Sequence, residues 1–171
     1  GTWVIGQEPF FKPLNKVINL WKLRTGYGQS GNQGGIDSYN SMALLRPTGV
    51  ISVQGSPTTT FGQFRNTNPD LKWETRSTFN IGTDIALLNS RIVLTAEYYY
   101  SLTTDMLYQY DVPVPPFTFN KFLANLGKMS NSGLEFGLGI IPITKKDMEL
   151  NINMNVAFQK NKLISLSGNY K

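Results

Sequence analysis

The chain has 171 residues, of which only 16% are charged, against about 25% in typical soluble proteins. No segment approaches the roughly 20 consecutive apolar residues of a membrane helix, and the absence of cysteine excludes disulfides and thiol chemistry. The chain has 16 basic and 11 acidic residues, which gives a net charge of +5. Because binding to nucleic-acid phosphates needs clustered cations and these basic residues are scattered, we do not expect nucleic acid as a partner.

The first clear periodicity lies in residues 17–29, where apolar and polar side chains alternate. A period of two is typical of a strand with unlike faces, so we predict a strand here, after a short strand at residues 3–5. The sequence GYGQSG at 26–31 matches a dinucleotide-binding fingerprint. No helical pattern or acidic residue about 20 positions later accompanies it, so we interpret it as a glycine-rich strand end.

Residues 30–74 are rich in small and polar residues and are predicted to form a long loop. A loop of this length is unusual inside a compact soluble domain. Long external loops are normal in outer-membrane barrels.

A β-hairpin is predicted next, with strands at Phe79–Leu87 and Ile92–Leu102 joined by Asn89-Ser90. This two-residue loop places Leu87 opposite Ile92, and the same register brings together only apolar residues along one face. The two strands have lengths close to the roughly 9 to 11 residues that a strand needs to cross a bilayer.

The remaining residues continue this pattern. Residues 103–125 contain a Pro-rich stretch and are predicted to form a second long loop, with continuation of the strands above the membrane as the open alternative. Two alternating strands follow, at 134–140 and 148–158, joined by a short turn around 144–146. The connections therefore read long, short, long, short, as in bacterial outer-membrane barrels. We predict an all-β fold made of antiparallel strands of a transmembrane β-barrel, with residues 30–74 and 103–125 as long extracellular loops.

The polar faces of these strands are the candidate functional surface. They would form a hydrated wall suited to the passage of polar solutes, although any water-filled barrel needs a polar lining. The candidate lumen-facing residues are Lys22, Arg24, Asn80, Asp84, Glu97, Glu135, Asn151, Asn153 and Asn155.

The sequence contains little that indicates an enzyme. Histidine and cysteine are both absent, and no cluster has the spacing of a metal or cofactor site. Asp84 and Glu97 are expected to lie diagonally on paired strands, about 7 to 8 Å apart, which overlaps the carboxylate separation of inverting glycosidases. We interpret the pair instead as a charged patch on the inner wall, balanced by Lys22, Arg24 or their neighbours, and we expect no catalytic residue.

Several stretches, in this order, resemble the SusC/RagA-type TonB-linked outer-membrane transporters of Bacteroidetes. They are LWKLRTGYGQSGNQ (20–33), NPDLKWET (68–75), FNIGTD (79–84), YYYSLTTDM (98–106), NLGKMSNSGLEF (125–136) and NKLISL (161–166).

The resemblance implies a fragment from the C-terminal part of a β-barrel in the bacterial outer membrane, about five or six strands of a larger barrel. The signal peptide, plug domain and terminal strands would then lie outside these 171 residues. It also implies uptake of oligosaccharides or peptides together with a SusD-like surface lipoprotein. TonB would act through parts of the protein not in this chain, and outer-membrane lipid would surround the barrel.

Two alternatives remain open from the residues alone. A soluble, secreted β-sandwich such as a carbohydrate-binding module also has alternating strands, but its apolar faces pack against each other. A surface adhesin would use the long loops to bind a partner without any transport.

Overall fold

The computed structural model describes residues 1–36 and 38–166. Over these residues the chain forms eight strands and two short 3-10 helices, and none of its helices is long and apolar enough to cross a membrane. The elements are β1 (Thr2–Val4), η1 (Ile5–Gln7), η2 (Pro9–Leu14), β2 (Ile18–Asn32), β3 (Leu45–Val53), β4 (Ser56–Gln63), β5 (Glu74–Leu87), β6 (Ile92–Asp111), β7 (Lys121–Lys145) and β8 (Met148–Ser165).

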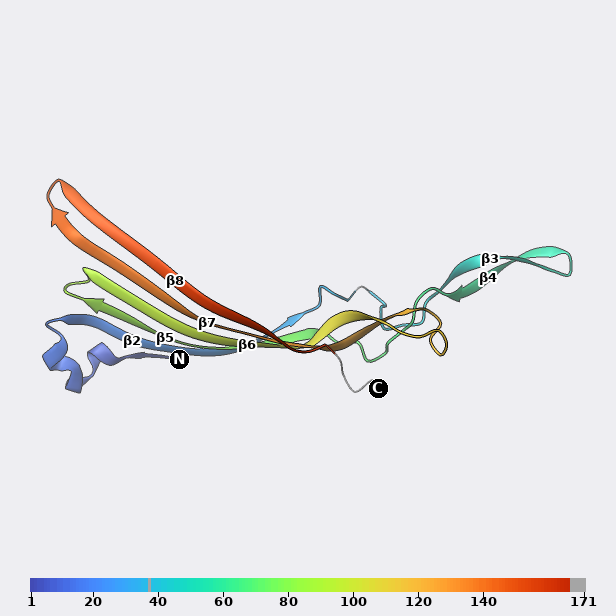
Figure 1. The fold of residues 1–171 in the computed structure, drawn as a ribbon, viewed down its shortest axis with the longest axis horizontal. Coiled ribbons are helices and arrows are strands. Elements are labelled where there is room, and N and C mark those ends of the chain that lie inside the picture. The colour runs from blue at the N-terminus through green and yellow to red at the C-terminus, as the bar shows by residue number, and fades with distance from the viewer. Residues whose placement is uncertain (37, 167–171) are drawn as a thin grey trace. The chain divides into compact units, whose positions relative to one another are not determined.

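Six strands form one sheet in the order β1-β2-β5-β6-β7-β8, and β3 and β4 form a separate two-stranded sheet. Figure 1 shows β2, β5, β6, β7 and β8 side by side in that order. The contacts divide the chain into two units. Unit 1 contains residues 1–30, 76–102 and 130–163, and unit 2 contains residues 31–75, 103–129 and those from 164 onward. The all-β prediction is confirmed.

The β5–β6 hairpin in unit 1 has the predicted two-residue loop. The amide of Arg91 donates to the carbonyl of Leu88 at 3.3 Å, and the central residues Asn89 and Ser90 have φ of 58° and 62°. Positive φ at both central positions is the type I′ geometry that matches the twist of paired strands. The hydroxyls of Thr78 and Ser101, 2.8 Å apart further along the hairpin, fit the predicted register.

The N-terminal segment of unit 1 packs against β2. Trp3 of β1 pairs with Leu23, and the ring of Phe11, which is only 2% exposed, meets the ring of Trp21 edge-on at 5.6 Å between centroids. The sequence predicted the short strand. It gave no indication that η2 would carry Phe11, one of the few buried side chains among the described residues.

The sheet of unit 1 leaves large apolar side chains exposed. Phe136 on β7 and Met154 on β8 are 46% and 56% exposed, and many alternate residues of β5 to β8 are similar. Apart from η2, whose Phe11 packs on Trp21 of β2, nothing in unit 1 forms a second layer over this face, so the packed apolar faces expected of a β-sandwich are not present over β5 to β8.

Both ranges that were predicted to be long loops, 30–74 and 103–125, contain strands in unit 2. The first range contains the β3–β4 hairpin, whose strands include β-branched residues and meet at Gln54-Gly55, both with positive φ. The second is mostly strand, because β6 continues to Asp111 and β7 begins at Lys121. Only the Pro-rich residues 112–120 connect them, since proline has no amide hydrogen to donate to a strand ladder.

Side-chain amides hold the irregular segment before β5 in unit 2. Asn125 donates to the carbonyls of Lys72 and Asp105 at 2.6 and 2.8 Å and accepts from the Lys72 amide at 2.9 Å. Asn68, only 6% exposed, donates to the carbonyl of Leu123 at 3.1 Å. These bonds satisfy backbone groups that have no strand partner.

Candidate functional site

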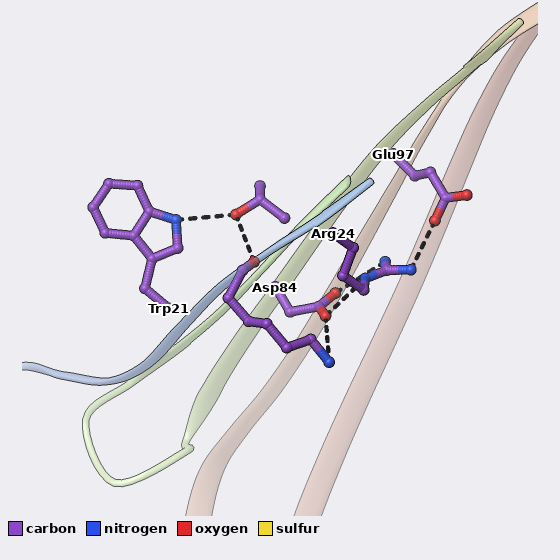
Figure 2. Close-up of polar contacts among 6 residues, drawn as sticks. Trp21, Arg24, Asp84 and Glu97 are labelled. Atoms are coloured by element: carbon purple, nitrogen blue, oxygen red, sulfur yellow. Dashed lines mark hydrogen bonds and ion pairs between the residues drawn. The ribbon is translucent and has the colours of Figure 1, made fainter. Parts of the chain in front are cut away.

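A cluster of ion pairs lies on one face of the unit 1 sheet, where β2, β5 and β6 run side by side. The carboxylate of Asp84 on β5 forms ion pairs with two cations of β2. Its oxygens lie 3.2 Å from the ammonium nitrogen of Lys22 and 2.9 and 3.1 Å from two guanidinium nitrogens of Arg24. The 2.9 Å contact, from Arg24 Nε, lacks hydrogen-bond geometry and is electrostatic only. Arg24 also reaches Glu97 of β6 at 3.1 Å, so one guanidinium joins both carboxylates, as Figure 2 shows.

This geometry supports the interpretation of the charged patch over that of a hydrolase. Arg24 lies between Asp84 and Glu97, in the space that a sugar ring would need. Each carboxylate contacts at least one cation, so the cluster carries little unpaired charge. Among the described residues, no group of three metal-ligating side chains lies together.

The other candidate residues extend this polar face. Glu135 and Asn155 line a hollow together with Arg24, Thr95 and Glu97. Asn151, Asn153 and Asn155 line a neighbouring hollow with Thr95, Gly137 and Gly139. Asn80 is separate from both hollows and lies with its side-chain oxygen over Gly26. The structure thus brings four candidate residues into one cluster of ion pairs: Lys22, Arg24, Asp84 and Glu97. Glu135 and Asn155 line the same hollow as Arg24 and Glu97.

The opposite face of the same sheet is apolar. Figure 2 shows the Trp21 ring on the other side of the strands from Asp84 and Glu97. Its indole N–H donates to the Thr83 hydroxyl at 3.0 Å, which donates to the Lys22 carbonyl at 3.2 Å. Further along, this face has an almost wholly apolar hollow lined by Thr83, Ile85, Leu94, Thr95, Ala96, Phe136, Gly137, Leu138, Met154 and Val156.

Two features of the polar face were missed in the sequence. The side chain of Tyr99 on β6 lies across Gly133 of β7, where a Cβ would lie 2.7 Å from two ring carbons and from the phenolic oxygen. Gly137, further along β7, leaves room in the same way for the Thr95 hydroxyl and for Asn155. The sequence did contain an indication of this, because β7 carries glycine at three positions of the polar face, 133, 137 and 139. A glycine alone does not reveal which side chain of the neighbouring strand occupies the space that it leaves.

Comparison with known proteins gives a consistent result over nearly the whole chain. Residues 11–171 match the family described as "TonB dependent receptor-like, beta-barrel". The chain is 34% identical over 168 residues to TonB-dependent receptor P26 of Formosa agariphila, covering 98% of this chain and 16% of that protein. It is 30% identical over 168 residues to TonB-dependent receptor SusC of Bacteroides thetaiotaomicron, covering 97% of this chain and 17% of SusC.

The solved structures agree with the sequence relatives. The RagAB peptide transporter superimposes with a TM-score of 0.76 at 27% identity, over 97% of this chain and 18% of that chain. The "open-open" state of the RagAB peptide importer gives a TM-score of 0.80 at 26% identity, over 95% of this chain and 17% of that chain. The chain therefore spans about one sixth of the length of the relatives that it matches.

Proposed function

The chain belongs to the TonB-dependent receptor β-barrel family, whose members are outer-membrane transporters rather than enzymes, and we propose that it forms part of the barrel wall and lumen of a SusC-like nutrient importer. In this role the apolar face of unit 1 contacts lipid and the polar face lines the water-filled interior. The chain supplies no catalytic chemistry, and transport is a property of the whole receptor.

The observation that carries this proposal is the two-sided character of one sheet. Its apolar side leaves side chains such as Phe136 and Met154 about half exposed, which in water would cost the free energy of apolar hydration. Its other side carries charged residues, among them Lys22, Arg24, Asp84, Glu97 and Glu135. A bilayer on one side and a hydrated lumen on the other satisfy both faces.

The partners and cargo follow from the relatives. RagAB is described as a peptide importer, and SusC is named as a TonB-dependent receptor. These descriptions support peptides as cargo, a RagB-like partner and a dependence on TonB for the whole protein. The resemblance to SusC/RagA-type transporters adds oligosaccharides as the other expected cargo and a SusD-like surface lipoprotein as the expected partner. The polar face is compatible with either cargo, since both present hydrogen-bonding groups.

The long connections belong on the outer side in this proposal. The β5–β6 and β7–β8 turns are short, as periplasmic turns are, whereas the β2–β5 and β6–β7 connections, at 33–73 and 112–120, lie at the other strand ends. The extracellular parts are then the β3–β4 hairpin and the upper ends of β6 and β7, in place of structureless loops.

Cysteine accessibility tests the assignment of faces, because this segment contains no cysteine of its own. In the full-length receptor, freed of any other cysteine, Glu135→Cys should react with a membrane-impermeant maleimide, whereas Phe136→Cys should not. Val50→Cys, in β3, should react on intact cells. Reaction of Phe136→Cys at the rate of Glu135→Cys would refute the assignment of the apolar face to lipid.

A transport assay tests the function itself. Cells that carry the receptor should accumulate a labelled peptide or oligosaccharide pool, and cells lacking the receptor or TonB should not. Uptake that persists without TonB would contradict the proposed mechanism.

A further inference from the structure

The connection between β1 and β2 differs from the other connections at its end of the unit 1 sheet. It covers residues 5–17 and contains η1 and η2, whereas the β5–β6 and β7–β8 turns are short. Figure 1 shows the coils of η1 and η2 at the same end of the sheet as these two turns, which we call the turn end. The amide of Leu88 in the β5–β6 turn donates to the Val17 carbonyl at 2.8 Å, so the connection is bonded to the turn end.

The β1–β2 connection packs on the apolar side of the sheet. The ring of Phe11 in η2 meets the ring of Trp21 edge-on at 5.6 Å between centroids. Trp21 lies on the side of the strands opposite to Asp84 and Glu97, as Figure 2 shows. Since the charged side faces the lumen in the proposed barrel, η2 lies against the outer side, away from whatever fills the lumen.

The surface of the connection is amphipathic. Phe10, Leu14 and Val17 are 67%, 51% and 52% exposed. Lys12 and Lys16 alternate with them along the chain and are exposed too, and within residues 1–36 and 38–166 neither lysine forms an ion pair. Exposed apolar side chains interleaved with lysines are typical of a segment that lies in a membrane interface.

The turn end also lies at the boundary of the apolar band. Leu87, directly before the β5–β6 turn, and Met148, directly after the β7–β8 turn, belong to the apolar sides of their strands. The hydrocarbon therefore ends close to the turns, which are periplasmic in the proposed barrel. Lysine side chains at that level keep their stems in the apolar region and reach the lipid headgroups with their ammonium groups.

The charge of the connection favours an anionic partner. Its only carboxylate, Glu8, accepts a hydrogen bond from the Trp3 indole at 2.8 Å and pairs with neither lysine. Both ammonium groups are therefore available to phosphate groups. Each lysine near an anionic membrane surface strengthens binding about fivefold.

We propose that the β1–β2 connection is an interfacial anchor for the periplasmic leaflet. Phe10, Leu14 and Val17 insert between lipid acyl chains, and Lys12 and Lys16 bind the phosphates of anionic phospholipids. The inference rests on the proposed barrel, because it takes the short turns as periplasmic and the apolar face as lipid-exposed. It adds a lipid-binding surface that the transport function does not require.

Fluorescence quenching in the full-length receptor tests the insertion. The receptor is freed of other cysteine, labelled at Leu14→Cys with an environment-sensitive fluorophore, and placed in phospholipid nanodiscs. The label should lose most of its emission to phospholipids that carry a nitroxide on the upper acyl chain, and little to iodide in the buffer. Lys146→Cys, in the β7–β8 turn, is the matched control and should respond mainly to iodide.

The same label tests the preference for anionic lipid. Nitroxide phosphatidylglycerol should quench it at a lipid fraction about fivefold lower than nitroxide phosphatidylcholine. Replacing both lysines, Lys12→Gln with Lys16→Gln, should remove this difference and leave quenching by the phosphatidylcholine probe unchanged, which shows that the variant keeps its fold. Lys146→Gln is the control and should keep the difference.

Two outcomes would overturn the anchor. One is strong iodide quenching at residue 14 while a label at Phe136→Cys on β7 is quenched by lipid, a result that leaves the importer intact. The other is equal quenching by the two nitroxide lipids in the unsubstituted receptor. Absence of lipid quenching at both residue 14 and residue 136 would instead count against the barrel itself.

Discussion

An arginine introduced on the apolar face of β8 should destabilise the receptor far more than one introduced at the next residue. Ile152 lies on the apolar face and is 42% exposed, and Asn153 lies on the polar face. We expect Ile152→Arg to lower the free energy of unfolding by about 2 to 4 kcal/mol, the cost of arginine at the bilayer midplane. Asn153→Arg should cost about 1 kcal/mol or less, because its guanidinium stays in water.

The depth of Ile152 follows from the length of the alternating run. Apolar and polar residues alternate from Met148 to Phe158, starting directly after the short turn. At about 3.3 Å per residue this run is about 33 Å long, and a tilt of about 40° reduces its height to about 25 Å. That height equals the apolar band of an outer-membrane barrel, so Ile152 lies near its middle.

Equilibrium unfolding of the full-length receptor in phospholipid vesicles would measure both variants. The denaturant concentration at the midpoint of unfolding should fall clearly for Ile152→Arg and little for Asn153→Arg. The slope of the free energy of unfolding against denaturant concentration should be the same for both variants. Met148→Arg, at the turn end of the same face, should cost less than Ile152→Arg because the penalty falls toward the interface. Equal losses at Ile152 and Asn153 would refute the assignment of the two faces.

Three further predictions concern contacts within each unit. Gly133→Ala should destabilise the barrel by about 1 to 3 kcal/mol, because its Cβ meets the Tyr99 ring, and adding Tyr99→Ala should recover part of the loss in the same unfolding assay. Asn125→Ala should cost about 1 to 3 kcal/mol through its three lost bonds, and limited proteolysis should then cut residues 66–74 faster, whereas unchanged cutting would mean that the segment is held by other contacts. Asp84→Asn should cost no more than about 1 kcal/mol, since Lys22 and Arg24 are about one third exposed, and the loss should shrink in high salt. A loss that does not depend on salt would exclude the ion pairs as its cause.

The strands and their faces were predictable because one physical rule fixes both. Alternation assigned the apolar and polar sides of β5, β6 and β8, and the Asn89-Ser90 loop fixed the β5–β6 register. The polar-face residues followed from the same alternation, which is why the candidate residues gather on one surface.

The contacts among those residues were not predictable in the same way. Arg24 reaches Asp84 and Glu97 only if β2 is paired with β5 at the observed offset. The connection between β2 and β5 is long, so no turn geometry sets that offset. In unit 2, nothing in the sequence distinguishes Asn68 and Asn125 from other polar residues of a loop. Their side chains bond carbonyls more than 50 residues away in the chain, so these bonds depend on the tertiary structure. The ends of β6 and β7, at Asp111 and Lys121, could not be placed from sequence, because the Pro-rich segment between them gives no periodic pattern.

Side chains provide the register information that the long β2–β5 connection lacks. Bonds cross this strand pair on both faces, from Trp21 to Thr83 at 3.0 Å and from Arg24 to Asp84 at 3.1 Å, and Gln29 reaches Ser77 at 2.9 Å further along. A slip by one residue would reverse both faces of β2 and break all three contacts at once. The charged cluster therefore contributes to the correct pairing of β2 with β5.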